Sequence, residues 1–322
     1  MSRAPDAAMD DLVSFERFMR EALYHPEKGY YAQRIRGIGR RGDFSTWATL
    51  DGSLARAVAA WIRGRGIRNV IEVGAGDGSL ARAVLSNLGW RRWWNVRYHI
   101  VEVSAPLREA QNKVLKGYGV EWHESPEQAL QKLNGQASIF SNELPDAFPC
   151  RVFEKSASGW MEVYVSANKG VSQECLQSCI LPDSTVFEYE FRSGSRVEVH
   201  ESYKQWLDAF APEWRSGEML TIDYGDTMPR LYHRRPTGTL RAYLAHQVLT
   251  GMEILDSPGT RDLTADVNFS DLEKWGGELG WQTLDQGTLR EFFQHWTPQV
   301  LIPAGFQDAA VAFRFIEQRA AS

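Results

Sequence analysis

The sequence predicts an α/β fold, in which an open and mostly parallel sheet carries helices on both faces. Strand and helix patterns alternate between residues 69 and 142, which is typical of a parallel sheet built from strand–helix–strand units. The first of these strands runs into a glycine-rich turn at residues 74–78. Glycine has no Cβ and tolerates positive φ, so such a turn lets the backbone approach a ligand closely.

The spacing of apolar residues predicts where each element of the fold begins and ends. We expect strands at residues 69–73, 97–103, 119–123, 137–142, 217–224, 281–285 and 309–316. We expect helices at residues 11–24, 50–64, 80–88, 106–115, 126–133, 198–210, 240–250 and 268–279. Residues 151–155 and 160–165 are typical of a hairpin, and a further strand is expected at 185–191.

These elements divide the chain into four parts. A helical N-terminal cap with a Gly-Asp-Phe loop occupies residues 1–48, and the first half of the sheet occupies residues 49–150. Residues 151–200 read as an antiparallel insertion. Residues 201–322 complete the sheet and contain a second insertion, expected to form a lid over the substrate, at about residues 226–268.

Composition and charge argue against several classes of protein. The 36 basic and 41 acidic residues give a net charge of −5, which disfavours a general nucleic-acid or anionic-membrane binder. The chain has no run of about 18 apolar residues, so we expect no membrane span. Three cysteines without framework spacing and an N-terminus without an apolar signal stretch favour the cytoplasm. Cys175 and Cys179 have no histidine or second cysteine pair nearby, so we expect no metal site.

The glycine-rich turn has the sequence Gly74-Ala75-Gly76-Asp77-Gly78. A dinucleotide-binding turn has the spacing G-x-G-x-x-G, whereas here the third glycine comes one residue early. With Glu72 ahead of it, the turn resembles motif I of class I S-adenosyl-L-methionine-dependent methyltransferases. We therefore expect Glu72, Gly74, Ala75, Gly76, Asp77 and Gly78 to bind this cofactor. The alternative is a tight strand–helix turn without a ligand.

Two acidic residues of this segment have a second interpretation each. The carboxylate of Glu72 could hold the cationic amino group of a methionyl ligand, or it could brace the loop. Asp77 could contact the same end of the ligand, or it could only cap the helix that starts beside it.

Polar residues follow the next two strands of the predicted sheet. Glu102 ends the second strand, 26 residues after Gly76, where a carboxylate can accept hydrogen bonds from two ribose hydroxyls. The alternative is a solvated acid at a strand end. Val103 adjoins Glu102, and Glu124 follows the third strand where an adenine pocket would form. We include both among the cofactor-binding candidates, whereas His123 has the simpler interpretation of a strand histidine with its polar atoms satisfied.

The segment Asn142-Glu143-Leu144-Pro145-Asp146 follows the fourth strand, where such folds keep the reacting group of the substrate. Methyl transfer from a sulfonium needs an aimed nucleophile and the exclusion of water. A guanidinium nucleophile is planar and cationic, so the carboxylates of Glu143 and Asp146 could grip it. Asn142 is a candidate for both the cofactor and the acceptor side. The alternative is a proline-defined loop with surface acids.

Taken together, these motifs resemble the MidA-like methyltransferases, whose mitochondrial relatives assist assembly of respiratory complex I and methylate an arginine in one of its subunits. The resemblance extends over about 270 residues. It rests on residues 18–31, 42–46, 72–78, 101–104, 141–143, 146–149, 222–225, 238–243, 246, 262–269 and 286–287.

This resemblance implies a class I methyltransferase with a Rossmann-like core and a mostly parallel seven-stranded sheet. It implies S-adenosyl-L-methionine as the cofactor and a protein as the substrate, with arginine the leading acceptor. It places Asp43 and Phe44 at the cofactor pocket, and Asp223 and Asp266 near the acceptor. Asp223 could equally cap the next turn, and Asp266 could cap the helix that begins near Asn268.

Two departures from the family pattern keep other functions open. Trp47-Ala48-Thr49 stands where the family usually has Ser-Pro-Glu, and Asp77 replaces a commoner arginine in the turn. The chain could therefore be an assembly or interaction factor that keeps the fold without turnover, or a methyltransferase for small molecules. As partners we expect a protein substrate, no nucleic acid and no membrane. A homodimer is one option, because the sequence does not set the oligomeric state.

Overall fold

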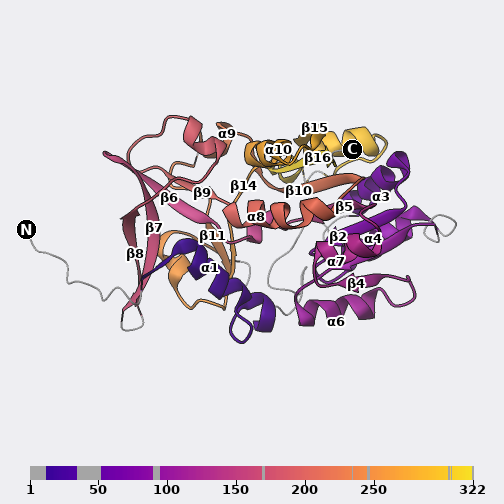
Figure 1. The fold of residues 1–322 in the computed structure, drawn as a ribbon, viewed down its shortest axis with the longest axis horizontal. Coiled ribbons are helices and arrows are strands. Elements are labelled where there is room, and N and C mark those ends of the chain that lie inside the picture. Colours follow the sequence, from indigo (N-terminus) through magenta and orange to yellow (C-terminus); the bar gives the residue numbers. More distant parts are fainter. Residues whose placement is uncertain are drawn as a thin grey trace, which may run out of the picture. The chain divides into compact units, whose positions relative to one another are not determined.

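The computed structural model describes residues 12–34, 52–89, 95–168, 171–233, 235–244, 247–303, 305 and 307–320. The chain forms two compact units (Figure 1). The first unit comprises residues 1–34, 147–203 and 228–265, and the second comprises residues 35–146, 204–227 and 266–322. Each unit is therefore assembled from segments that lie far apart in the sequence.

The second unit contains the predicted sheet. Its described strands run in the order β15-β16-β10-β5-β2-β3-β4, and β14 pairs with β10. Neighbouring strands from β4 to β10 are parallel, whereas β16 is antiparallel to both β10 and β15. The strand bounds are β2 (Asn69–Val73), β3 (Arg97–Val101), β4 (Glu121–His123), β5 (Ser138–Asn142), β10 (Glu218–Asp226), β14 (Val267–Asn268), β15 (Gln282–Thr288) and β16 (Phe313–Arg319). The predicted mostly parallel sheet is confirmed.

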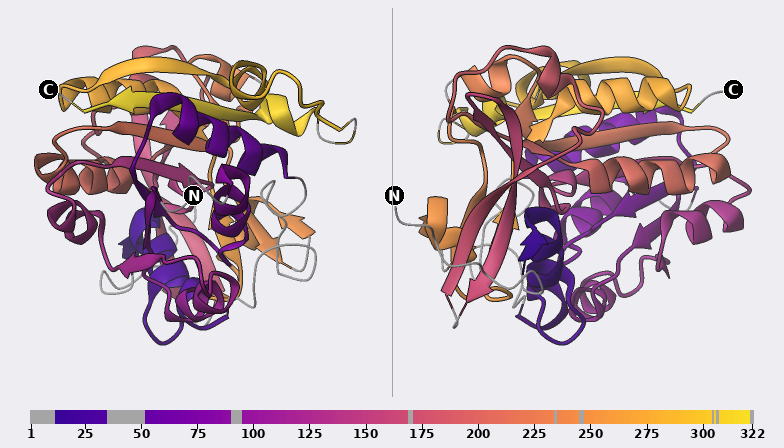
Figure 2. Two further views of the ribbon diagram at one scale, coloured as in Figure 1. Left: turned by 90° about the vertical axis from the view of Figure 1, so that its right-hand side faces the viewer. Right: turned by 60° about the vertical axis from the view of Figure 1, so that its left-hand side comes forward.

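Helices cover both faces of this sheet (Figure 2). The helix α3 (Ser53–Arg65) contacts α4 (Ser79–Leu88) and α11 (Leu289–Trp296), and α4 contacts α6 (Ala105–Val114). A second set packs on the strands themselves. It comprises α7 (Pro126–Lys132), which contacts β2, β3 and β4, and α10 (Phe269–Glu278), which contacts β10, β15 and β16. Strands covered in this way are buried along nearly their whole length, as β2 and β5 are. This explains why their apolar residues are not confined to one face of the sheet.

The first unit is built from antiparallel sheets. Five described strands pair in the order β1-β7-β6-β9, with β8 on the other side of β7. Their bounds are β1 (Leu12–Ser14), β6 (Arg151–Ser156), β7 (Gly159–Asn168), β8 (Val171–Ser178) and β9 (Arg196–Val199). A smaller sheet has the order β12-β11-β13, with β11 (Arg241–Leu244), β12 (Gln247–Leu249) and β13 (Asp262–Thr264).

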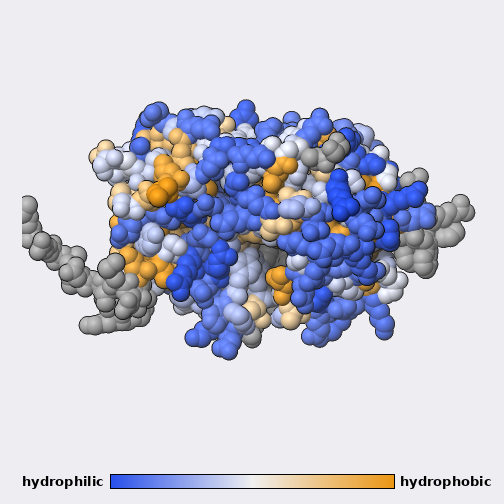
Figure 3. Space-filling model, viewed as in Figure 1, coloured by the Kyte–Doolittle hydropathy of each residue, from blue (hydrophilic) through white to orange (hydrophobic). Residues whose placement is uncertain are grey.

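Helices of the first unit are short. They are α1 (Phe15–Tyr24), α9 (Arg230–His233), the π-helix η2 (Tyr30–Arg34), and the 3-10 helices η4 (Thr185–Glu188) and η6 (Gly251–Leu255). The remaining short elements of the chain are α8 (Glu201–Phe210), α12 (Ala309–Ala312), η3 (Pro145–Ala147) and η5 (Ala211–Glu213). The face shown in Figure 3 is mostly hydrophilic, with small apolar areas scattered over it.

Several predicted elements differ from the structure. Residues 309–312 of the strand expected at 309–316 form the helix α12, and the strand β16 begins at Phe313. The expected strand at residues 185–191 is the helix η4, because the Ser184 side chain caps the turn by accepting a hydrogen bond from Val186 N. The expected helix at 240–250 is the strand pair β11 and β12. The expected helix at 11–24 starts only at Phe15, after the capping residue Ser14. The helix α11 has no counterpart among the predicted elements.

The contacts of Glu198 explain why glycine and threonine occupy positions 238 and 239 in the first unit. Its buried carboxylate accepts hydrogen bonds from Thr239 N at 2.9 Å, Thr239 Oγ1 at 3.0 Å and Tyr232 OH at 3.0 Å. Gly238 has φ +88°, and a Cβ at that position would lie 2.2 Å from Glu198 Oε1. The Gly238-Thr239 pair therefore wraps closely around this acid, and burial raises the pKa of Glu198 above its ordinary value.

Candidate active site

The glycine-rich turn connects β2 to α4 and has a backbone that other residues would strain. Gly74, Gly76 and Gly78 have φ values of 70°, 56° and 82°, in the left-handed region that favours glycine. A Cβ on Gly78 would also lie 3.3 Å from both Cα and Cγ of Gln111. The N-cap residue of α4 is Gly78, which makes no side-chain hydrogen bond to the first turn. Apart from Ser79 N, which donates to Asp77 Oδ1, the N–H groups of this turn can therefore be offered to a ligand at the carboxyl end of β2.

Asp77 contacts the start of α4, as in the alternative interpretation in which this residue caps the helix. Its Oδ1 accepts a hydrogen bond from Ser79 N at 2.9 Å, at the first residue of α4. This bond turns the carboxylate toward the helix start. A contact between Asp77 and a cofactor stays a prediction.

Glu72 is buried in β2, directly before the turn. Tyr98 OH donates a hydrogen bond to Glu72 Oε2 at 2.6 Å. Burial raises the pKa of Glu72 to about 8, although the bond from Tyr98 opposes this shift. A nearby cation would favour the ionised form, so this position suits the ammonium group expected from the sequence.

Glu102 is held by a residue that sequence reasoning missed. Ser104 N donates to Glu102 Oε1 at 2.9 Å, and Gln111 Nε2 donates to Glu102 Oε2 at 2.9 Å. Gln111 Nε2 also donates to the carbonyl oxygen of Gly76 at 2.8 Å, and Gln111 Oε1 accepts from Trp122 Nε1 at 2.9 Å. The pKa of Glu102 is raised, mainly because the side chain is buried. One glutamine thus connects the strand-end acid, the glycine turn and the indole of Trp122.

Val103 and Glu124 occupy different surroundings. Val103 exposes 72% of its surface directly after Glu102, and so offers an apolar contact beside that acid. Glu124 is exposed, and its backbone N–H donates to Gln128 Oε1 at 3.1 Å. The adenine roles suggested for both residues stay predictions. Asp43 and Phe44 lie outside the described residues.

A cluster of acids lies where β5 ends beside β10, and we call Glu143, Asp146 and Asp223 the acid cluster. Ile222 O accepts a hydrogen bond from Glu143 N at 2.9 Å, which continues the pairing of β5 with β10. Asp223 Oδ2 accepts from Asp146 N at 3.1 Å, and Asp223 Oδ1 accepts from Tyr224 N at 2.7 Å. The structure therefore brings together two segments that are 77 residues apart.

Two features of the acid cluster are energetically unfavourable by themselves. Asp223 is fully buried, and burial raises its pKa well above the ordinary value, with further contributions from the charges of Asp146 and Glu143. Glu143 has φ 53°, a left-handed conformation that costs on the order of 1–3 kcal/mol for a residue with a Cβ. A cation bound at the cluster would compensate the crowding of negative charge.

Asn142 adds an acceptor to the cluster. Its Nδ2 donates to Glu143 Oε1 at 3.1 Å. Its Oδ1 is buried, and within the described part of the chain it has no hydrogen-bond partner. A buried acceptor of this kind usually has a partner, so a ligand that offers an N–H or O–H donor fits here.

Asp266 is buried next to β14, which pairs with β10 at Gly225. The side chain that caps α10 is Asn268, which accepts from Ser270 N at 3.1 Å. Asp266 therefore does not serve as that cap, and its expected role near the acceptor stays a prediction.

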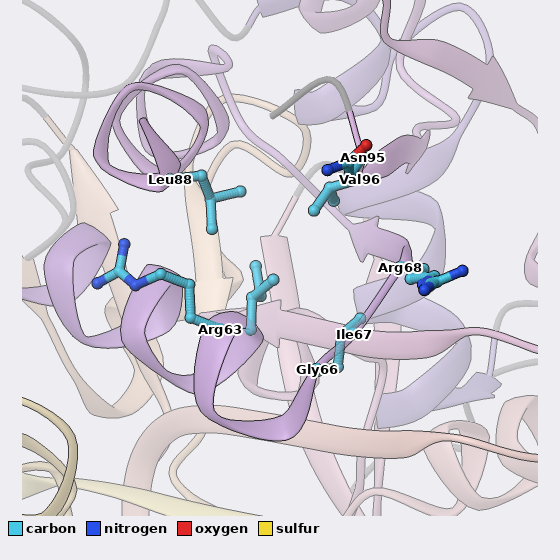
Figure 4. A pocket seen from close by; sticks show the side chains of 8 residues that line it. Arg63, Gly66, Ile67, Arg68, Leu88, Asn95 and Val96 are labelled. Atoms are coloured by element: carbon cyan, nitrogen blue, oxygen red, sulfur yellow. The ribbon is translucent and has the colours of Figure 1, made fainter. Parts of the chain in front are cut away.

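A pocket of about 340 Å³ lies at the opposite ends of the strands (Figure 4). Arg68 directly precedes β2 and Val96 directly precedes β3, and both line this pocket. In open parallel sheets, ligands bind at the carboxyl ends of the strands. The glycine turn, Glu102 and the acid cluster all lie at those ends, so this pocket is not the candidate active site.

Comparisons with known proteins identify the family and its cofactor. A family model described as "Putative S-adenosyl-L-methionine-dependent methyltransferase" matches residues 53–286. A methyl transferase-type protein from Burkholderia thailandensis, solved with S-adenosyl-homocysteine bound, is 26% identical with a TM-score of 0.81. The alignment covers 96% of this chain and 88% of that one. The glycine turn and the free acceptor of Asn142 fit such a cofactor, because both offer polar backbone or side-chain atoms to a ligand.

Curated relatives carry more specific names. The protein arginine methyltransferase NDUFAF7, mitochondrial, of Xenopus tropicalis is 26% identical over 88% of this chain and 71% of its own length. The Mus musculus protein of the same name is 27% identical over 81% of this chain and 66% of its own length. This chain thus spans about two thirds of the length of these relatives.

These names correct one prediction. The relatives are named as mitochondrial proteins, so the expected cytoplasmic location is wrong. Separately, none of the helices in the described ranges is both long and apolar enough to cross a membrane.

The family model covers well over half of the chain, and the chain belongs to the family of S-adenosyl-L-methionine-dependent methyltransferases.

Proposed function

We propose that this methyltransferase modifies an arginine side chain of a protein. The observation that carries the proposal is the acid cluster, in which Asp223 is fully buried and bonded to the backbone of Asp146. The names of the curated relatives, which are protein arginine methyltransferases, support the same acceptor.

A guanidinium group suits this cluster both in charge and in shape. It is always cationic and presents five N–H donors in one plane. Three neighbouring carboxyl groups can accept several of these donors, while the positive charge offsets their mutual repulsion. Glu143 and Asp146 would hold the guanidinium and draw its charge away from the attacking nitrogen. Asp223 would fix the loop that carries Asp146.

The residues of the glycine turn and the strand ends would hold the cofactor. We assign the ribose hydroxyls to Glu102 and the ammonium group to Glu72, with the turn at residues 74–78 approaching the ligand through its backbone. When bound, S-adenosyl-L-methionine supplies an electrophilic methyl group. The task of the protein is then to orient the acceptor nitrogen and to exclude water.

The variant Glu143→Gln tests this proposal. It keeps the size of the side chain but removes its charge, so we expect methyl transfer to fall by on the order of 100-fold. Calorimetry with S-adenosyl-homocysteine should give unchanged binding. Glu109→Gln is the matched control, because Glu109 is exposed on α6. Full activity of Glu143→Gln on the acceptor would rule out the carboxylate grip.

A transfer assay with radiolabelled methyl groups on cell lysate separates the remaining alternatives. Label on protein arginines supports the proposal, and label on small molecules favours a natural-product or metabolite methyltransferase. If S-adenosyl-homocysteine binds but no label is transferred, the chain acts as an assembly or interaction factor that keeps the fold.

A further inference from the structure

Three side chains of metal-ligand type meet on β3 and β4, away from the acid cluster on β5 and β10. They are His99, Glu121 and His123, and one ligand-type atom of each lies within 4.8 Å of the other two. His99 Nδ1 and His123 Nε2 are 2.9 Å apart. Within the described part of the chain, this is the only group of three or more such residues with that geometry.

The strand register explains why these side chains meet. His99 lies opposite Glu121, and Val101 lies opposite His123, in the parallel pairing of β3 with β4. Alternate residues of a strand point to the same face, so all three side chains share one face of the sheet. His99 is almost fully buried and His123 is largely buried. Both rings are therefore held by the fold instead of moving freely in solvent.

We propose that His99, Glu121 and His123 bind one Zn²⁺ ion. Two imidazoles and one carboxylate are an established zinc ligand set, in which a water completes the tetrahedron. Tetrahedral bonds of about 2.0–2.1 Å place two nitrogen ligands about 3.3 Å apart. The two nitrogens thus need to separate by a few tenths of an ångström, and the rings need to turn so that both lone pairs face the ion.

The surroundings of the site include one competitor for Glu121. Lys132 of α7 pairs with Glu121, and its side chain is more than half exposed. Zinc would displace this ammonium from Glu121, and Lys132 is free to extend into solvent.

The site would act as a clamp between two strands. The strand β4 has only three residues and pairs with β3, and Glu102 N donates to the carbonyl oxygen of His123 at 3.2 Å. A metal that bridges β3 and β4 would stabilise this pairing beside Glu102. The proposal concerns structural stabilisation and does not depend on arginine being the methyl acceptor.

Titration of the full-length protein with ZnCl₂ by calorimetry tests the site, with Co²⁺ absorption as a second readout of tetrahedral coordination. We expect one ion per chain and a higher thermal midpoint in its presence. His123→Asn and Glu121→Gln should each weaken zinc binding by about 10–100-fold or more. Lys132→Gln should strengthen it, because the competing ammonium is gone.

Two controls and one safeguard complete the experiment. His295→Asn and Lys113→Gln alter exposed residues of the same types elsewhere in the second unit and should leave zinc binding unchanged. If His123→Asn fails to fold, Glu121→Gln still decides, because Glu121 is partly exposed. No binding of zinc, or binding that Glu121→Gln leaves unchanged, overturns the proposal.

Discussion

Gln111 Nε2 lies 2.9 Å from Glu102 Oε2 and donates a hydrogen bond to it. The same nitrogen donates to Gly76 O, so one amide fixes both a carboxylate and the turn that faces it. Gln111 is fully buried, and its own oxygen is satisfied by Trp122. The position of Glu102 therefore depends on a residue of α6 that need not touch a ligand itself.

Replacing Gln111 tests this dependence. We expect Gln111→Leu to weaken the binding of S-adenosyl-homocysteine by about 1–3 kcal/mol, because Glu102 and the indole N–H of Trp122 each lose a buried partner. Calorimetry measures the affinity. The neighbouring residue Asn112 is exposed, and its side chain donates to Arg108 O within α6, so Asn112→Leu should bind as the wild type does. Equal affinities for both variants would show that Gln111 does not position Glu102.

Glu72 predicts a specific dependence of stability on pH. Its pKa is about 8 in the folded protein and about 4.3 in an unfolded chain. Between these values the folded protein binds the extra proton, so the free energy of unfolding falls as pH rises, by on the order of 1 kcal/mol per pH unit. Glu72→Gln cannot ionise but keeps an oxygen for Tyr98 OH. We expect it to reduce this loss between pH 5 and pH 8.

Urea unfolding at pH 5 and pH 8 measures the effect, as the difference between wild type and variant at each pH. That difference removes the contributions of other buried acids, which are common to both proteins. Glu253→Gln serves as the control, because Glu253 is exposed. A variant whose stability changes with pH as steeply as that of the wild type would contradict the prediction.

Gly225 predicts a steric effect on stability. It has φ 151°, and a Cβ there would lie 2.0 Å from Val267 O in the adjoining strand. Gly159 has a similar φ of 140°, but a Cβ would meet nothing within 4 Å. Both alanine variants introduce backbone strain, and only Gly225→Ala forces β10 and β14 apart. We expect it to lower the free energy of unfolding by about 1–3 kcal/mol more than Gly159→Ala does. Similar urea midpoints for the two variants would be inconsistent with the close approach of these strands.

Local patterns account for what the sequence could predict. The strand at 69–73 and the helix after it are correct because a buried apolar run and a glycine turn are features of neighbouring residues. The sequence predicts a helix where the structure has the strands β11 and β12, because Leu240-Arg241-Ala242 favours a helix locally. Their extended form depends on pairing with β13, about 20 residues further along the chain.

In the candidate site, too, features of neighbouring residues could be predicted from the sequence, whereas contacts between distant residues could not. Strand-end acids could be placed from the sequence, because parallel strands end at one edge of the sheet. The bond between Asp223 and Asp146 N could not, since the two residues are 77 positions apart. The sequence gives one weak indication that Gln111 is buried, because it lies at helical spacing between the apolar residues Leu107 and Leu115. Only the fold shows that this face of α6 meets Glu102.

The left-handed backbone of Glu143 sets stability against function at one position. Glycine, and to a lesser degree asparagine, would adopt the same conformation with less strain, so Glu143→Gly should resist heat better. Under the proposed function, the same change removes the carboxylate that holds the acceptor. A library of variants at position 143 would therefore yield different residues when it is selected for heat resistance and when it is selected for methyl transfer.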